Sequence, residues 1–84
     1  MINLAALPIQ QLRTLAALNA LTTPEQPCSV SDVSNLTRYT LIYQYETLHD
    51  MMRKNMIQCD IVGYWNITPE YAVAFVRGVL GGEG

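Results

Sequence analysis

The sequence predicts a mainly α-helical fold with one small β-hairpin, in the order helix, helix, helix, hairpin, helix. Three observations predict it. Apolar residues recur at helical spacing in four segments, capping residues separate these segments, and a glycine lies between two short strand-like segments. The 84 residues contain no internal repeat, so we expect one domain that spans residues 1–84.

The composition argues against several classes of protein. Half of the residues are apolar, 14% are charged and the formal net charge is -2, which is not typical of a disordered chain. The same charge argues against a strongly basic nucleic-acid-binding module. Because the chain is too short for an enzyme with its own cofactor domain, we expect no enzymatic activity and no cofactor.

Two features bear on the cellular compartment. No uncharged stretch reaches the ~20 apolar residues that a membrane span needs. The first basic residue, Arg13, follows the apolar N-terminal segment, whereas a signal peptide has its positive charges first. We therefore expect a cytoplasmic protein in which Cys28 and Cys59 are reduced, partly buried thiols.

The first helix is predicted over residues 4–21, with Pro8 in its first turn, where a missing N–H is tolerated. Its apolar face is broader than the surface helix of a monomer needs, which predicts a homodimer contact that Phe75 and Leu80 of the final helix could join. Burial on two sides by its own chain is the alternative. The buried stripe is expected to consist of Ile9, Leu12, Ala16 and Ala20, with Leu15 and Leu18 beside it.

Hydroxyl side chains mark the starts of the next two helices. Ser29 or Ser31 can cap the second helix, which ends near residues 37–39. Thr40 can cap a third helix that runs to about Lys54, and Asn55 follows as a left-handed C-terminal cap. The buried stripe of the third helix is expected to be Leu41, Tyr45, Leu48 and Met52, with Gln44 and Met51 flanking it.

The C-terminal third predicts a hairpin and a last helix. Two strand-like segments, residues 56–62 and 64–67, flank Gly63. Thr68 then caps the final helix, with Pro69 at its first position. The aromatic side chains Tyr45, Trp65 and Tyr71 are expected to help fill the core.

Residues 29–57 resemble the winged helix-turn-helix family position by position, and the likeness extends over roughly residues 5–80. The chain looks most similar to MarR-like and related small bacterial or phage regulators. Asn55 stands where that family has Gly, and residues 63–70 look like the strand that runs into its last helix. Further matching positions are Val30, Val33, Thr40, Leu48, Met51, Met56 and Ile57.

What the resemblance implies is binding to double-stranded DNA, with the third helix in the major groove and the hairpin, or wing, near the phosphates. The resemblance thus implies a transcription regulator. Arg38, Arg53 and Lys54 are the candidates for phosphate contacts, while Thr40 and Tyr43 help to position the helix.

The charge pattern keeps a second interpretation open. The predicted outward face of the third helix consists of Ile42, Tyr43, Glu46, His49, Asp50 and Arg53, and it holds few groups that contact bases or phosphates. The wing has no basic residue. The alternative is a winged-helix protein-interaction module that has lost DNA binding, such as a phage antagonist or assembly factor, in which Ile42, Tyr43 and Glu46 contact a protein partner.

No catalytic or metal-binding motif accompanies these features. His49 and Asp50 are not expected to form a catalytic pair, because adjacent residues on a helix do not face each other. We expect His49 to be a partly exposed surface histidine. Cys28 and Cys59 lack the close spacing of zinc ligands, so we expect no metal site.

Overall fold

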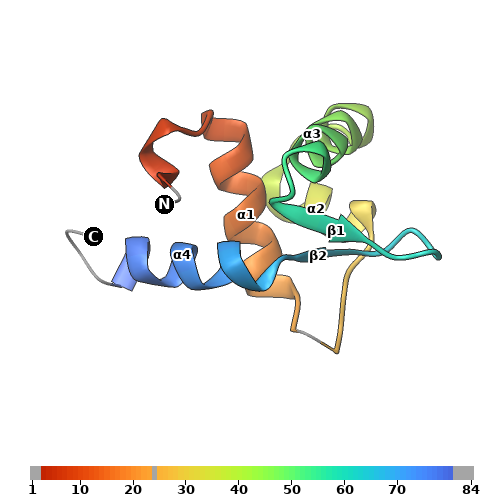
Figure 1. The fold of residues 1–84 in the computed structure, drawn as a ribbon. Coiled ribbons are helices and arrows are strands. Elements are labelled where there is room, and N and C mark those ends of the chain that lie inside the picture. Colours follow the sequence, from red (N-terminus) through yellow and green to blue (C-terminus); the bar gives the residue numbers. More distant parts are fainter. Residues whose placement is uncertain (1–2, 24, 81–84) are drawn as a thin grey trace.

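The computed structural model describes residues 3–23 and 25–80 of the chain. In this part, four α-helices pack with a two-stranded antiparallel hairpin whose tip projects from one side of the molecule, in the predicted order of elements (Figure 1). The elements are the 3-10 turn η1 (Leu4–Ala6), α1 (Ile9–Leu21), α2 (Val30–Thr37), α3 (Leu41–Arg53), β1 (Ile57–Cys59), β2 (Trp65–Ile67) and α4 (Pro69–Leu80).

The prediction of one continuous helix over residues 4–21 is wrong at its start. Pro8 precedes α1 instead of lying in its first turn, and Leu7 is extended (φ -81°, ψ 146°). A residue before proline is pushed out of the helical region by contact with the proline ring. The chain therefore forms η1, breaks at Leu7, and begins α1 at Ile9.

The buried face of α1 also differs from the predicted stripe. Ile9, Ala16 and Ala20 are exposed, whereas Leu15 and Leu18 are fully buried. The buried set is completed by Gln11, Thr14 and Ala17. Two polar residues lie on this face because they find hydrogen-bond partners on α3.

The starts of α2 and α3 are fixed by the predicted caps. Ser29 and Asp32 form a reciprocal capping box, in which the Asp32 N–H donates to Ser29 Oγ at 3.2 Å. The Thr40 hydroxyl accepts the N–H of Tyr43 at 3.2 Å. Between the two helices, Arg38 adopts a left-handed conformation with φ 72°, which produces the tight turn.

The hairpin is shorter than predicted. β1 pairs with β2 in the register Ile57↔Ile67, Gln58↔Asn66 and Cys59↔Trp65. The strands end at Cys59 and Trp65, and beyond them Asp60 closes the turn: its N–H donates to the Tyr64 carbonyl, and its carboxylate accepts the N–H groups of Val62, Gly63 and Tyr64. Gly63 provides the positive φ of 101° that this turn contains.

Cys28 adds a short extended segment to the free edge of β2. Its N–H donates to the carbonyl of Trp65 at 2.9 Å, and its carbonyl accepts the N–H of Trp65 at 2.7 Å. These bonds connect the chain before α2 to the hairpin, and the sequence pattern did not predict them.

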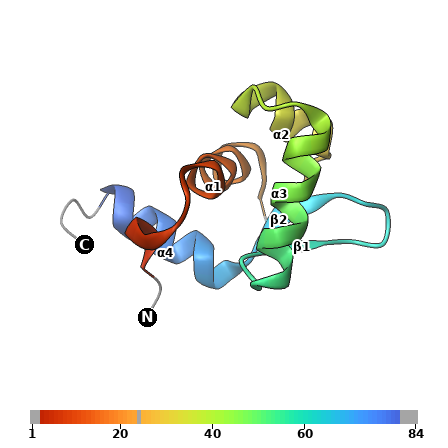
Figure 2. The ribbon, with the colours of Figure 1, turned by 90° about the horizontal axis from the view of Figure 1, so that it is seen from above.

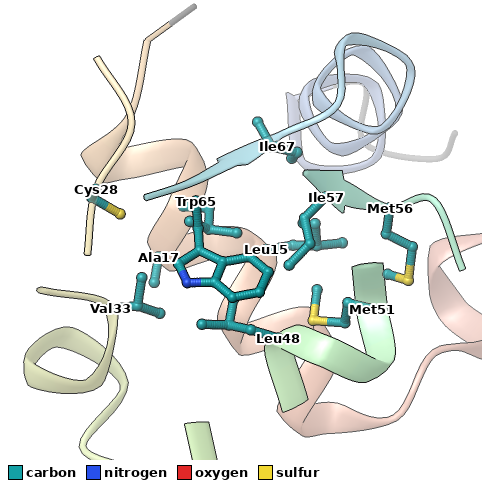
Figure 3. Packing of buried hydrophobic residues seen from close by; sticks show 11 residues of the cluster. Leu15, Ala17, Cys28, Val33, Leu48, Met51, Met56, Ile57, Trp65 and Ile67 are labelled. Atoms are coloured by element: carbon teal, nitrogen blue, oxygen red, sulfur yellow. The ribbon is translucent and has the colours of Figure 1, made fainter. Parts of the chain in front are cut away.

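The core centres on Trp65, whose indole lies among side chains from α1, α2 and α3 (Figure 3). Met51 and Met56 are also fully buried and fill the part of the core next to Ile57 (Figure 3). The expectation for Tyr45 is wrong, since half of this residue is exposed. Tyr71 is half-buried against the core. The fully buried large side chains are Trp65, Leu15, Leu18, Leu48, Met51, Met56, Ile57, Gln44, Val33 and Thr14.

Helix α4 and the hairpin tip point to opposite ends of the molecule (Figures 1 and 2). Phe75 packs partly against the core, whereas Val73 and Val76 are exposed. The side chain of Leu80, expected to join a dimer contact, lies outside the described part. Among residues 3–23 and 25–80, no helix is both long and apolar enough to cross a membrane.

Candidate nucleic-acid interface

Helix α3 has one face built into the core and one face that the rest of the described chain leaves open. Its inward residues Gln44, Thr47, Leu48 and Met51 are buried. The predicted outward residues Ile42, Tyr43, Glu46 and Arg53 are exposed, with Ile42 at 75%. The predicted stripe is therefore wrong at Leu41 and Tyr45, which are both exposed, because the buried face is rotated towards the polar residues Gln44 and Thr47.

A buried polar network sets the orientation of this helix. Gln44 Nε2 donates to the Thr14 hydroxyl of α1 at 2.9 Å, and Gln44 Oε1 accepts from the Thr37 hydroxyl of α2. Thr14 in turn donates to the carbonyl of Gln10 at 2.8 Å. The Gln44 side chain thus connects α3 to both neighbouring helices by hydrogen bonds between groups that have few other partners inside the core.

The N-terminal end of α3 gathers two cations and two aromatic rings. Arg38 is exposed at the turn before the helix. The Tyr39 ring contacts the Tyr43 ring edge-on, at 5.0 Å between centroids. The Arg13 guanidinium of α1 lies 5.4 Å from the Tyr39 ring centre. The predictions included Arg38 and Tyr43 but missed Arg13, because no spacing rule connects it to residues 38–43.

The C-terminal end of α3 holds Arg53 and Lys54, but both are paired. Asp50 Oδ1 lies 3.4 Å from Arg53 Nη2, and Asp50 Oδ2 lies 3.7 Å from Lys54 Nζ. Asp50 Oδ2 also accepts a hydrogen bond from Gln11 Nε2 of α1 at 3.0 Å. Asp50 is therefore half-buried between α1 and α3, not simply outward-facing as predicted.

The wing presents an apolar tip. Ile61 is fully exposed and Val62 largely so, while Tyr64 is half-exposed at the base of the turn. Residues 58–66 contain no basic side chain, and the carboxylate of Asp60 is engaged by three backbone N–H groups of the turn. Any contact of this tip with DNA or protein therefore depends on shape and apolar surface rather than on attraction to phosphate.

A shallow groove lies along α3, on the side that meets the hairpin. Tyr45, Glu46, His49 and Arg53 line its volume of about 380 Å³. The His49 ring is partly exposed, as predicted, and lies 4.3 Å from the Tyr45 ring and 5.3 Å from the Trp65 ring, between centroids. Its Nε2 atom is buried and has no hydrogen-bond partner among the described residues.

The two cysteines are free thiols, as expected. Burial, with a smaller effect of the nearby Asp32 carboxylate, raises the pKa of the Cys28 thiol to about 11. Burial and Asp60 also raise the pKa of Cys59. Both thiols therefore stay protonated near neutral pH. Within residues 3–23 and 25–80, no three His, Cys, Asp or Glu side chains come together as a metal site.

No family model and no curated protein matches this sequence. The fold does have a solved counterpart in BpsR of Bordetella bronchiseptica, a protein whose DNA binding is regulated by 6-hydroxynicotinic acid. The two are 18% identical, with a TM-score of 0.71 over 94% of this chain and 58% of that chain. This chain thus spans less than two thirds of BpsR's length. The likeness and the element order together establish a winged helix-turn-helix fold.

Proposed function

We propose that this chain is a winged-helix DNA-binding protein, a small bacterial or phage transcription regulator that places α3 in the major groove. One observation carries the proposal. The outward face of α3 is left open by the rest of the described chain, and basic side chains stand at both ends of it. Such an arrangement lets phosphate contacts at the ends hold the helix while its middle meets the base edges.

Each residue of this face has a role that fits its chemistry. Arg38 and Arg13 contact phosphates at one end of α3, and Arg53 and Lys54 do so at the other. Between them, a carboxylate such as Glu46 accepts a hydrogen bond from cytosine, and an apolar group such as Ile42 packs on a thymine methyl. The remaining two candidates, Thr40 and Tyr43, fix the start of the helix and flank the base-contacting positions.

The low number of cations favours a dimer. Neutralising several phosphates supplies the sequence-independent part of DNA affinity, and one copy of this chain has few groups to do so. We propose that residues 1–84 form one domain that pairs with a second copy in the cytoplasm and doubles the cations on the DNA. The exposed Ile9 and Leu21 on α1, the helix with the broad apolar face, are available for that contact.

Salt-dependent binding to a pool of random duplexes tests the proposal. Each phosphate contact contributes about 0.9 to the slope of log affinity against log salt. Arg38→Ala and the double variant Arg53→Ala with Lys54→Ala are expected to weaken binding and flatten this slope. Arg77→Ala removes an exposed cation that lies on α4 instead of α3, and it is expected to change neither the affinity nor the slope. Absence of duplex binding by the wild type at low salt would refute the proposal.

One observation favours a protein partner as the second candidate. Apolar side chains are exposed on both α3 and the wing, and large exposed apolar patches often mark protein interfaces. The exposed apolar side chains of α3 and the wing are Leu41, Ile42, Tyr43, Tyr45, Ile61, Val62 and Tyr64.

A capture experiment separates this candidate from DNA binding. We expect a true partner to be retained by the wild type from nuclease-treated lysate, and to be lost with the double variant Ile42→Ala and Tyr43→Ala. Val73→Ala, an exposed apolar residue on α4, serves as the control. Equal capture by all three proteins would show that the α3 face is not the binding surface.

A further inference from the structure

We propose that Asp50 is an affinity-determining residue that holds Arg53 and Lys54 away from DNA phosphates and so lowers the affinity of α3 for DNA. This inference rests on the proposed function. Its basis is the contact between one carboxylate and the two cations at the C-terminal end of α3, which lie three and four residues beyond it on the same helix.

The carboxylate is held in place from two sides. Its Oδ2 atom accepts the Gln11 side-chain N–H at 3.0 Å, a bond that comes from α1 and not from α3 itself. Gln11 is almost fully buried, so its amide has little freedom to turn away. Asp50 therefore keeps its negative charge at this end of α3 whether or not Arg53 or Lys54 remains beside it.

The two cations, by contrast, are free to change partner. The side chain of Arg53 is 70% exposed and that of Lys54 is 49% exposed. Their pairs with Asp50 are long, at 3.4 and 3.7 Å, and surface pairs of this kind are weak. A DNA phosphate can take the place of Asp50 as the partner of these cations. Asp50 opposes this exchange, because its carboxylate attracts the cations and repels the phosphate.

This balance predicts a specific dependence on salt. Both effects of Asp50 act between partly exposed groups and weaken as ionic strength rises, since the Debye length falls to about 10 Å at 0.1 M. Removing the charge is therefore expected to increase DNA affinity most at low salt. The plot of log affinity against log salt then becomes steeper.

Asp50→Asn is the variant that isolates the charge. The asparagine oxygen can still accept from Gln11, so the contact between α1 and α3 is retained. We expect duplex affinity to rise about fivefold at low salt, which corresponds to two surface ion pairs of about 0.5 kcal/mol each. Glu25→Gln, which removes the same charge in the loop between α1 and α2, is expected to have little effect.

The decisive experiment places Asp50→Asn in the wild type and in the variant that lacks both cations, Arg53→Ala with Lys54→Ala. Affinity for a random duplex pool is measured by fluorescence anisotropy over a range of salt. We expect Asp50→Asn to increase duplex affinity in the wild-type background and to have much less effect in the variant that lacks the two cations. A purely structural role for Asp50 would not produce this dependence on Arg53 and Lys54. Denaturant unfolding of each variant checks that the fold is retained.

The outcomes separate the two proposals. If the wild type binds duplex DNA but Asp50→Asn leaves affinity and slope unchanged, the role of Asp50 is refuted and DNA binding stands. An equal gain from Glu25→Gln, or a full gain in the background without cations, refutes it as well. If the wild type fails to bind duplex DNA under any condition, both proposals fall together.

Discussion

The two faces of α3 differ in almost every physical property. The inward face is buried and fully engaged: Gln44 bonds to two neighbouring helices, and Leu48 and Met51 pack against Trp65 and the hairpin. The outward face, by contrast, exposes apolar and charged groups that make few contacts within the chain. The inward face thus determines the fold, and the outward face is free to determine what the molecule binds. Substitutions should therefore separate cleanly into two classes.

The largest expected effect is at Trp65 of β2, which packs against the inward face of α3. The indole is 2% exposed and lies at the centre of the core, so Trp65→Ala should lower the free energy of unfolding by about 3–5 kcal/mol. Urea unfolding followed by circular dichroism measures this loss. Tyr64→Ala, at the half-exposed neighbouring position, should cost much less. Similar losses at both positions would contradict the proposed division.

The buried network at Gln44 should produce the next effect. Gln44→Ala removes the acceptor of the Thr37 hydroxyl and one of the two hydrogen bonds of Thr14, and the loss of these buried bonds should cost about 1–3 kcal/mol. The exposed Gln58→Ala in β1 is the matched control, with an expected change of about 0.5 kcal/mol or less. Equal unfolding midpoints for the two variants would show that the network does not stabilise α3.

A smaller effect is expected at Thr40, where the two faces of α3 begin. Its hydroxyl accepts the Tyr43 N–H, and loss of such a cap costs about 1 kcal/mol. Thr40→Ala should lower the thermal midpoint, whereas Thr40→Ser keeps the acceptor oxygen and should retain most of the stability. A serine variant as unstable as the alanine variant would assign the effect to lost packing instead.

The last effect depends on pH and concerns Cys28. The unfolded thiol loses its proton near pH 9, whereas the folded thiol holds it to about pH 11. Its stabilising contribution is therefore complete below about pH 9 and is lost as the pH rises towards 11. The difference in unfolding free energy between the wild type and Cys28→Ala should fall over this range.

Subtracting the variant removes every pH-dependent contribution that the two proteins share. Cys59→Ala, at a more exposed thiol, should show a weaker trend. A wild-type to Cys28→Ala difference that stays constant from pH 8 to 11 would contradict the assignment.

The order of elements could be predicted because local chemistry marks their ends. Ser29 and Thr40 cap helices, Gly63 closes the hairpin turn, and Asn55 adopts the left-handed conformation expected of a C-terminal cap, with φ 61°. These signals act over a few residues, so they can be read from the sequence. Among the helix starts, the break at Leu7 was missed, although Pro8 indicated it.

The buried faces of α1 and α3 could not be predicted in the same way. The interpretation assumed that buried positions are apolar, whereas Gln11, Thr14, Gln44 and Thr47 are all buried. Two polar residues become a favourable core pair only when another helix brings them together, and no local spacing records that pairing. For this reason, the predicted buried stripes of α1 and α3 both differ from the faces that are buried in the structure.

The candidate site was predicted unevenly. The exposure of Ile42, Tyr43 and Arg53 followed from helical geometry and is confirmed. The spacing of Asp50 from Arg53 and Lys54 was also sufficient to predict their pairing, but it was not used. The bond from Gln11 to Asp50 joins residues 39 positions apart, and only the tertiary structure reveals it.

Mapping bound DNA onto the chain by nuclear magnetic resonance shows directly which face of the molecule contacts the duplex. A short duplex enriched from the random pool is titrated into the wild-type protein, and shifts of the backbone amide signals are recorded. If α3 is the DNA-binding face, the largest shifts lie at residues 38–46 and 53–54, with smaller shifts at the wing and none along α4. Shifts concentrated on α4, or spread evenly over the chain, would contradict the assignment of α3 as the DNA-binding face.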